Sequence, residues 1–319
     1  MAFKVLGTGS ALPARVVTND ELSAFLDTSD EWIYSRTGIK NRRLCVDETL
    51  DDLAVSASRR ALEAAGVGPE QIDLVVCSTS TADHLMPAEA CAVAERLGAR
   101  CAAFDVSAAC AGFVLALDVA DGYISRGRAR RVLVVACEQM SRILDWKDRS
   151  TCVLFGDGAA AAVLGACVGE NPLAMRFSTL PEVGTLEVPG VSGASPYFEG
   201  ARPKSVLKMD GRRVFRFGVA AICDEVEALA SEAGVRVADI NHFVFHQANE
   251  RILAAAVRRL GIDDARVART LRETGNVSSA CIPLAFDELS RAGKLVPGEL
   301  IAMVGFGAGL DIGACLLRW

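Results

Sequence analysis

The sequence DVSAACAGFVLALDVA at residues 105–120 returns in altered form as NVSSACIPLAFDELS at residues 276–290. Aligning Cys110 with Cys281 gives an offset of 171 residues. Two more pairs follow in the same order at an offset of 168: IDLVVCSTS (72–80) with INHFVFHQA (240–248), and RVLVVACEQMS (131–141) with ELIAMVGFGAG (299–309). Three ordered pairs at nearly one offset predict two similar halves, residues 1–170 and 171–319.

Each half is expected to alternate strands with helices. Residues 72–79, 99–106 and 131–139 have the apolar, β-branched pattern of buried strands, and residues 49–66 and 88–98 have the pattern of amphipathic helices. This alternation predicts an α/β fold.

Local signals add detail to this arrangement. Thr18 and Glu21, and likewise Thr28 and Glu31, stand at capping-box spacing and predict two helix starts. The stretch 172–206 is rich in Pro, Gly and Ser, so we expect a loop-containing insertion at the start of the second half.

The composition limits the classes of function. The 319 residues are 51% hydrophobic and 23% charged, which is typical of a globular protein with ample core. The first residues read as a strand rather than a signal peptide, and no apolar run approaches the ~20 residues of a membrane span. Eleven cysteines without a C-x-x-C pair, and only three histidines, argue against a disulfide scaffold or a zinc site. We therefore expect a cytoplasmic protein, and the net charge of −6 argues against nucleic acid as a partner.

Three residues are candidates for chemistry. Cys110 follows a predicted strand and begins a helix expected from about Ala109 to Ser125, where the helix N-terminus would favour a thiolate. Taken alone, it is more simply read as a buried structural thiol. His246 ends a predicted strand, where ligands bind in α/β sheets, and Asn276 by itself fits a turn. Because duplicated halves can face one another across a pseudo-twofold axis, these three side chains could share one site. Cys281 is interpreted as structural.

Six ordered segments make the pattern specific. They are DTSDEWIYSRTGIKNRR (27–43), DVSAACAGF (105–113), DRSTCVLFGDGAAAAVL (148–164), FHQANERI (245–252), TGNVSSACIPLA (274–285) and GFGAGLDIG (305–313). Together they resemble the β-ketoacyl-[acyl-carrier-protein] synthase III family, the thiolase-superfamily condensing enzymes that start fatty acid synthesis. The resemblance extends over essentially the whole chain.

The resemblance implies a thiolase-like five-layered αβαβα fold from two duplicated halves, normally as a homodimer. It assigns Cys110, His246 and Asn276 as the catalytic triad and places Trp32 and Arg149 on either side of the coenzyme A adenine. It also implies that Thr28, Arg36 and Asn249 lie near coenzyme A and that Phe306 lies against the sulfur. Gly307 and Ala308 would form an oxyanion turn with the Cys110 backbone. The residues implied for docking of acyl carrier protein are Arg216, Arg251, Arg258 and Arg259.

The implied reaction transfers a short acyl group from acyl-coenzyme A to Cys110 and condenses it with malonyl-acyl carrier protein. It needs no metal or redox cofactor. An asparagine amide donates hydrogen bonds without titrating, which suits decarboxylation. Thiolases resemble this fold but use a second cysteine in the C-terminal loop, and here that loop reads GFGAGL, so thiolase is disfavoured.

Three positions depart from, or vary within, the family pattern. Arg212 stands where some members have an asparagine that touches the pantetheine arm, which leaves that contact open. Ala308 replaces a common glycine. Met86 falls where a partner subunit closes the acyl pocket in some members, but its flexibility leaves the preferred primer open.

The sequence also allows three alternative functions to be considered. A starter-unit ketosynthase or acyltransferase of a secondary-metabolite pathway would use the same triad, although acyltransferase relatives tend to lack the asparagine found at Asn276. A cysteine hydrolase also combines Cys, His and Asn, but the local sequence and the repeat disfavour it. An inactive binding module is disfavoured by the intact triad.

Overall fold

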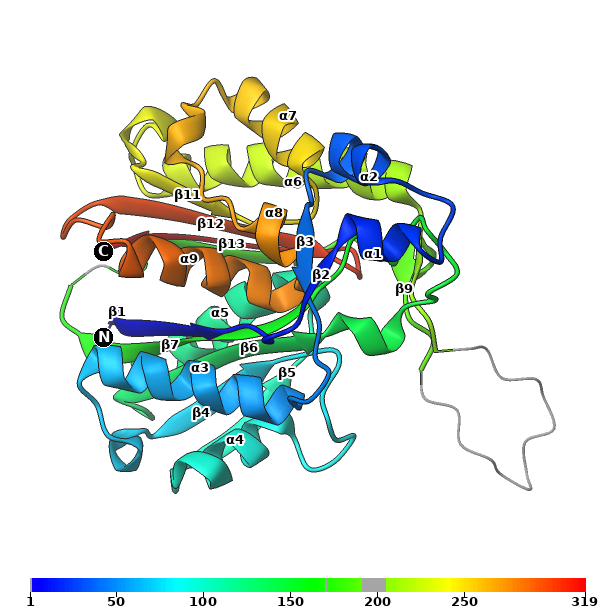
Figure 1. Cartoon of the computed structure of the whole chain (residues 1–319). Helices are drawn as coiled ribbons and strands as arrows, with labels where there is room; N and C mark the ends of the chain where they lie inside the picture. Colours follow the sequence, from blue (N-terminus) through cyan, green and yellow to red (C-terminus); the bar gives the residue numbers. More distant parts are fainter. Residues whose placement is uncertain (1, 170, 191–204) are drawn as a thin grey trace.

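The computed structural model describes residues 2–169, 171–190 and 205–319. Two sheets lie face to face with helices between and outside them (Figure 1). The first sheet has the strand order β1-β7-β6-β4-β5. Its bounds are β1 Ala2–Ala11, β4 Leu74–Ser78, β5 Ala102–Val106, β6 Arg131–Gln139 and β7 Asp157–Cys167.

The second sheet has the order β11-β12-β13-β8. Its bounds are β8 Ala174–Thr179, β11 His242–Phe245, β12 Leu300–Gly307 and β13 Asp311–Arg318. In the second sheet, β8–β13 and β13–β12 are antiparallel pairs and β12–β11 is a parallel pair. In the first sheet, β1–β7 and β7–β6 are likewise antiparallel and β6–β4 is parallel. A parallel bridge from Phe243 to Val267 stands where the first sheet has β5. The two sheets therefore repeat one topology, as the sequence repeat predicted.

Helices form the other three layers. On the outer face of the first sheet lie α3 (Leu50–Ala65) and α4 (Glu89–Leu97), and on the outer face of the second lie α6 (Gly211–Glu232) and α7 (Glu250–Leu260). Between the sheets lie α5 (Gly112–Ser125) and α9 (Cys281–Arg291). The predicted five-layered αβαβα fold is confirmed. The boundary at 170/171 stays a prediction, and it falls in the connection between β7 and β8.

The central layer holds the largest apolar core. Phe113 and Leu117 of α5 and Ile282 and Phe286 of α9 are buried in one cluster with strands of both sheets. This core fixes the two helices that follow Cys110 and Asn276 in the sequence, and so it fixes those residues relative to one another. Among the helices of the described residues, none combines the length and the hydropathy that crossing a bilayer requires.

A smaller lobe covers one end of the sheets. It is built from β2 (Val16–Thr18), α1 (Asn19–Ser23), α2 (Asp30–Thr37), β3 (Asn41–Arg43), β9 (Leu186–Glu187), β10 (Lys208–Met209) and α8 (Leu271–Thr274). The predicted capping box at Thr18 and Glu21 is present at α1. The one predicted at Thr28 is wrong, because α2 is capped by Ser29, whose Oγ accepts a hydrogen bond from the Trp32 amide at 3.1 Å.

Two further expectations need correction. The segment 172–206, expected to be a loop-containing insertion, is not wholly an insertion, because it contains β8, which completes the second sheet. Residues 191–204 of that prediction lie outside the described residues. The helix expected from Ala109 begins only at Gly112, and a single 3-10 turn, Ala109–Ala111, precedes it.

Candidate active site

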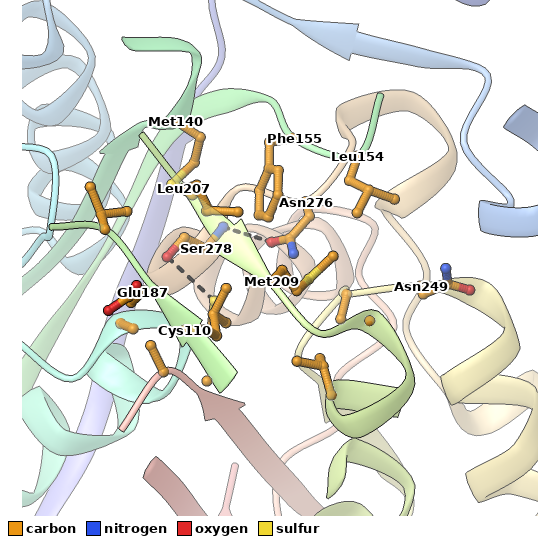
Figure 2. Close-up of a pocket in the computed structure, with 18 of the residues that line it drawn as sticks. Cys110, Met140, Leu154, Phe155, Glu187, Leu207, Met209, Asn249, Asn276 and Ser278 are labelled. Atoms are coloured by element: carbon orange, nitrogen blue, oxygen red, sulfur yellow. Dashed lines mark hydrogen bonds between the residues drawn. The ribbon is translucent and has the colours of Figure 1, made fainter. Parts of the chain in front are cut away.

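Cys110 lies in the 3-10 turn between β5 and α5 and is buried. The equivalent place in the second half is the 3-10 turn Ser278–Ala280 ahead of α9. The first residue of each turn has the same unusual backbone conformation, with a positive φ of 43° at Ala109 and 47° at Ser278. The turns meet, with Cys110 Sγ 3.4 Å from Ser278 Oγ (Figure 2). Equivalent elements of the two halves therefore face one another at the cysteine.

His246 follows the last residue of β11, and its backbone amide donates to the Val304 carbonyl at 2.9 Å. Its ring stands edge-on to Phe306, with centroids 5.2 Å apart and planes at 78°. Burial lowers the pKa of His246 to about 3. The imidazole is therefore neutral near pH 7, so it can donate one hydrogen bond and is a weak base. The implied contact of Phe306 with the sulfur stays a prediction.

Asn276 stands on the turn before α9, where its backbone amide donates to the Leu154 carbonyl at 2.8 Å. Its Oδ1 accepts a hydrogen bond from the Ser278 amide at 2.8 Å. This contact fixes which end of the carboxamide faces the protein and turns the Nδ2 group toward the cavity (Figure 2). Asn276 is thereby oriented as a hydrogen-bond donor.

Cys110, His246 and Asn276 line one cavity of about 690 Å³. Phe306, Gly307 and Ala308 line it beside the cysteine, and Trp32, Arg36, Arg149 and Asn249 line it toward the small lobe. Side chains from both halves thus open into a common space, as the repeat suggested.

The expected stabilisation of a Cys110 thiolate is wrong for the resting structure. Burial raises the pKa of Cys110 to about 12. The residue lies in a 3-10 turn before α5 rather than at an exposed helix N-terminus, so the loss of water outweighs the helix dipole. The thiol is protonated at rest, and its hydrogen points to Ser278 Oγ.

The end of β12 passes directly against the cysteine turn. A Cβ placed on Gly307 would lie 2.8 Å from the Cys110 amide nitrogen and 3.1 Å from Cys110 Cβ. A Cβ on Gly305 would lie 2.9 Å from the Ala111 Cα. Only glycine fits at these places, because a side chain would push the strand away from the nucleophile. This close approach brings the 307–308 turn next to the Cys110 backbone.

At the mouth of the cavity, the Trp32 ring contacts two guanidinium groups. Arg36 Cζ is 4.6 Å and Arg149 Cζ is 5.1 Å from the centre of the ring. A planar base between Trp32 and Arg149 needs two stacking contacts, about 7 Å in all. Arg149 also donates to the Asp27 carboxylate at 3.0 Å. The predicted sandwich therefore requires Arg149 to move away from Asp27 and from the ring.

Two other residues, Asn249 and Thr28, were also predicted to lie near coenzyme A. Asn249 caps α7, accepting from the Arg251 amide at 2.8 Å, and its Nδ2 donates to the Arg36 carbonyl at 3.1 Å. It therefore ties α7 to α2 as well as lining the cavity. Thr28 is absent from the lining, although its hydroxyl is buried without a hydrogen-bond partner among the described residues.

The predicted docking arginines differ in their surroundings. Arg216 on α6 and Arg258 on α7 are exposed, and neither has an ion pair within the described part of the chain. Arg259 pairs with Asp224 at 2.7 Å. Arg251 donates to the Ser35 carbonyl at 2.8 and 3.2 Å and so helps to hold α2. Arg216 and Arg258 are thus exposed cations of this face whose charge no described carboxylate pairs with.

Sequence reasoning missed two residues beside the cysteine, Ser278 and Glu138. Ser278 lies in a motif quoted above, but no pattern marked its side chain. Glu138 had a readable signal, because it is a carboxylate that directly follows the apolar run VLVVAC (132–137). It is fully buried at the end of β6. Cys281, predicted to be structural, is buried and accepts a hydrogen bond from the Val277 amide at 3.0 Å.

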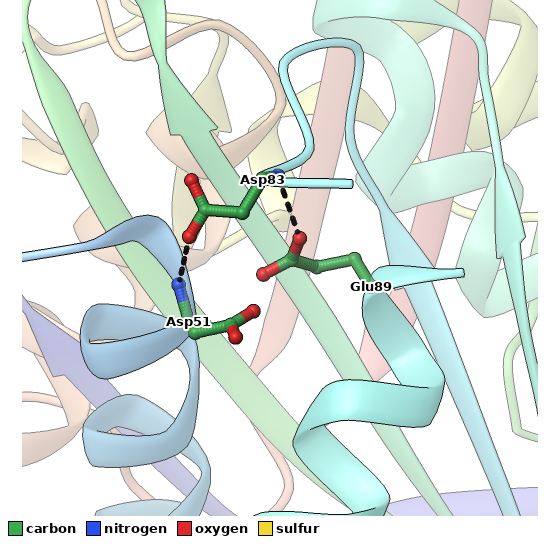
Figure 3. A group of neighbouring side chains, drawn as sticks. All are labelled: Asp51, Asp83 and Glu89. Atoms are coloured by element: carbon green, nitrogen blue, oxygen red, sulfur yellow. Dashed lines mark hydrogen bonds between the residues drawn. The ribbon is translucent and has the colours of Figure 1, made fainter. Parts of the chain in front are cut away.

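One group of carboxylates outside the cavity has the spacing of metal ligands, namely Asp51, Asp83 and Glu89 (Figure 3). Its charge is already compensated. Asp83 accepts from the Asp51 amide at 2.9 Å and from Arg142 at 2.6 Å, and Glu89 accepts from the Asp83 amide at 3.0 Å. Burial raises the pKa of Glu89 to about 8, so this group keeps its proton beside Asp51 at neutral pH. We therefore assign no metal to this group.

Comparisons with known proteins agree with the geometry. Residues 104–180 match the family model for 3-oxoacyl-[acyl-carrier-protein] synthase III, and residues 230–319 match the model for its C-terminal part. The β-ketoacyl-[acyl-carrier-protein] synthase III of Erythrobacter litoralis is 44% identical over 99% of this chain and 98% of its own.

Two solved structures illustrate the range of relatives. The 3-oxoacyl-[acyl-carrier-protein] synthase III of Aquifex aeolicus has a TM-score of 0.92 at 39% identity and covers both chains fully. The priming β-ketosynthase of the R1128 polyketide pathway has a TM-score of 0.92 at 44% identity, over 99% of this chain and 96% of the other.

The layered fold and the cavity with a buried cysteine define the class of the protein, a thiolase-like acyltransferase. Its relatives match almost the full length of both chains at well over 30% identity. The chain belongs to the β-ketoacyl-[acyl-carrier-protein] synthase III family.

Proposed function

We propose that the chain condenses a short acyl-coenzyme A with malonyl-acyl carrier protein, with loss of carbon dioxide, to give a β-ketoacyl-acyl carrier protein. This reaction initiates type II fatty acid synthesis. The observation that supports it is that Cys110, His246 and Asn276 open into one cavity of a chain that belongs to this family.

The first half-reaction is acyl transfer to the cysteine. Cys110 Sγ attacks the thioester carbonyl, and the oxyanion is stabilised by the backbone N–H groups of Cys110 and of the 307–308 turn. The close approach of Gly307 to the Cys110 amide supports this arrangement. Each such donor is worth about 3–4 kcal/mol in other enzymes. Coenzyme A leaves, and an acyl-cysteine remains.

The second half-reaction forms the carbon–carbon bond. Asn276 Nδ2 and a neutral His246 donate hydrogen bonds to the thioester carbonyl of malonyl-acyl carrier protein. The carbon–carboxylate bond breaks, and its electron pair forms an enolate held by these donors. The enolate carbon then attacks the acyl-cysteine, and the Cys110 sulfur leaves. The orientation of the Asn276 carboxamide and the low pKa of His246 suit donors that do not change charge.

Coenzyme A would enter past the small lobe. Trp32, Arg36, Arg149 and Asn249 line that end of the cavity, and Thr28 is not among the lining residues. Guanidinium groups suit both phosphate contacts and stacking on adenine. Arg149 would exchange its contact with Asp27 for the nucleotide.

Acylation of Cys110 is the decisive test of this function. Incubation with a panel of short acyl-coenzyme A thioesters is expected to add one acyl group, found by mass spectrometry on the peptide that contains Cys110. Cys110→Ala should show no adduct, and the Cys281 peptide should stay unmodified in both proteins. Absence of an adduct with every thioester, on reduced and folded protein, would contradict the proposal and leave no acyl-cysteine step.

Carrier protein is proposed to dock on the α6–α7 face. Its acidic surface would meet the cations Arg216 and Arg258, with Arg251 and Arg259 beside them. Because Arg251 also holds α2 through Ser35, a change at Arg251 would disturb both substrates.

Arg258→Glu is therefore the cleaner test of docking. It should lower kcat/KM for malonyl-acyl carrier protein about tenfold and leave acyl loading from acyl-coenzyme A within about twofold. Arg59→Glu, on the opposite outer layer in α3, makes the same charge change and should alter neither value. An equal loss in the two half-reactions of Arg258→Glu would argue against docking at this face.

A homodimer is part of the proposal. Leu85 and Met86 are 81% and 80% exposed on one loop, and an adjacent subunit would cover them. We place this assembly in the cytoplasm.

A second candidate function comes from one relative, the R1128 priming β-ketosynthase. A polyketide starter role would use the same residues with a different primer. Preferential acylation by longer or branched primers in the thioester panel would favour that role.

A further inference from the structure

Glu138 is a carboxylate enclosed at the end of β6, between the two halves. Its Oε1 accepts hydrogen bonds from Ser278 Oγ at 3.2 Å and from Ser279 Oγ at 2.8 Å. Its Oε2 accepts from Thr81 Oγ1 at 2.6 Å and from the Ser80 amide at 3.1 Å. All four donors are neutral, although a buried carboxylate is usually paired with a cation. Glu138 is thus well placed to take up a proton.

One of these donors connects Glu138 to the nucleophile. Ser278 Oγ lies 3.4 Å from Cys110 Sγ and 3.2 Å from Glu138 Oε1. A serine hydroxyl has one hydrogen to donate. If that hydrogen goes to the carboxylate, Ser278 must accept from the thiol, so the hydrogen bonds run in one direction from sulfur to carboxylate. The left-handed backbone of Ser278 and the Asn276 contact to its amide hold the hydroxyl there.

The alternative acceptor for the thiol proton is His246, which has no hydrogen bond to Cys110 within the described residues. Burial lowers the pKa of His246 to about 3, so the imidazole is a poor base. Burial raises the pKa of Glu138, while the hydrogen bonds from Thr81, Ser279, the Ser80 amide and Ser278 act in the opposite direction and favour the carboxylate. The titratable groups that surround the pair are Cys281 on α9, Cys77 on β4, Cys137 on β6 and His246 after β11.

We propose that Ser278 and Glu138 form a proton relay that receives the proton of Cys110 during acyl transfer. As the sulfur lone pair bonds to the thioester carbon, the S–H bond breaks and its proton passes to Ser278 Oγ. The Ser278 hydroxyl proton passes to Glu138 Oε1, and the carbonyl π electrons move to oxygen. Coenzyme A then leaves as a thiolate and takes a proton from water. In the condensation, the departing Cys110 thiolate recovers the proton of Glu138 through Ser278, which restores the resting state.

The relay rests on the proposed function, but it can be tested separately with a reagent that needs no coenzyme A. The rate of Cys110 alkylation by iodoacetamide is measured from pH 6 to 10, beside the rate of acylation by acetyl-coenzyme A. Ser278→Ala removes the bridge, and Glu138→Gln keeps the shape of the side chain but cannot take up a proton. Ser279→Ala is the matched control, because it also deletes a hydroxyl bound to Glu138 but does not touch Cys110.

At pH 7 we expect Ser278→Ala and Glu138→Gln to acylate about 100-fold more slowly than the parent, in line with general base catalysis. Their alkylation rates should rise tenfold per pH unit, as for a thiol that ionises only into water, whereas the parent's rate should rise less steeply because Glu138 receives the proton. Ser279→Ala should lose less than about threefold and keep the parent's pH profile. The double variant Ser278→Ala/Glu138→Gln should be no slower than the slower single variant, because both remove one relay.

The relay would be overturned if Ser278→Ala kept the parent's dependence of alkylation rate on pH, or if Ser278→Ala and Ser279→Ala lost acylation rate equally. The contacts of Ser278 and Glu138 would then have only a structural role. If Glu138→Gln fails to fold, Ser278→Ala still decides, because it retains the carboxylate. An acyl adduct in the parent with no effect in Ser278→Ala would reject the relay alone, whereas no adduct in the parent would reject the proposed function.

Discussion

Gly307→Ala is expected to lose acyl loading by at least about 10³-fold. The new Cβ would stand 2.8 Å from the Cys110 amide nitrogen, where no real Cβ fits, so β12 or the cysteine turn must shift. Such a shift moves the donors of the oxyanion away from the thioester carbonyl. Loss of a single donor costs about 10²–10³-fold in other enzymes, and here donors on both sides of the contact are displaced.

The measurement is the rate of Cys110 acylation by acetyl-coenzyme A under single-turnover conditions. Gly122→Ala is the control, because a Cβ there meets nothing within 4 Å and the change is also glycine to alanine. Circular dichroism and a thermal melt would confirm that both variants fold. Normal loading by folded Gly307→Ala would show that the 307–308 turn does not hold the oxyanion.

Asn276→Asp is expected to separate the two half-reactions. Aspartate retains the oxygen that accepts from the Ser278 amide, so the turn and Cys110 should keep their places. It replaces the Nδ2 donor in the cavity with an acceptor, which removes one of the two hydrogen bonds proposed for the enolate. We expect decarboxylation of malonyl-acyl carrier protein to fall by about 10²–10³-fold and acyl loading to stay within about threefold.

The two rates can be followed on the same preparation, by release of carbon dioxide and by the acyl adduct. Asn276→Ala is the useful contrast, because it removes the Ser278 contact as well and should slow loading too. Proportional loss of both half-reactions in Asn276→Asp would mean that the carboxamide acts by shaping the turn rather than by donating to the enolate.

The internal repeat predicted two α/β halves of one topology, and the family resemblance implied their five-layered arrangement. The repeat also predicted that Cys110, His246 and Asn276 would reach a common space, since equivalent turns face one another in such a pair. Those predictions depend on the order of elements, which periodicity in the sequence records well.

Predictions that depended on local electrostatics succeeded less well. The helix start was expected to favour a Cys110 thiolate, but burial has the larger effect on the pKa of Cys110, and a helix-start pattern does not show how the two effects balance. The cap of α2 was misplaced at Thr28, and the contact of Arg251 with α2 was not foreseen. Arg251 is held by a carbonyl 216 residues away in sequence, and the cap of α2 is one residue beyond Thr28. Contacts of that kind require coordinates.

The matching bends at Ala109 and Ser278 have a mechanical consequence. The first bend positions the sulfur of Cys110, and the second positions the Ser278 hydroxyl that the sulfur contacts. Each bend lies in the turn that leads into a central helix, α5 or α9. The spacing between these two atoms therefore depends on the packing of the central core, which contains Phe113 of α5 and Ile282 and Phe286 of α9. A substitution deep in that interior, with no contact to substrate, would alter the reactivity of the nucleophile before it altered the shape of the pocket.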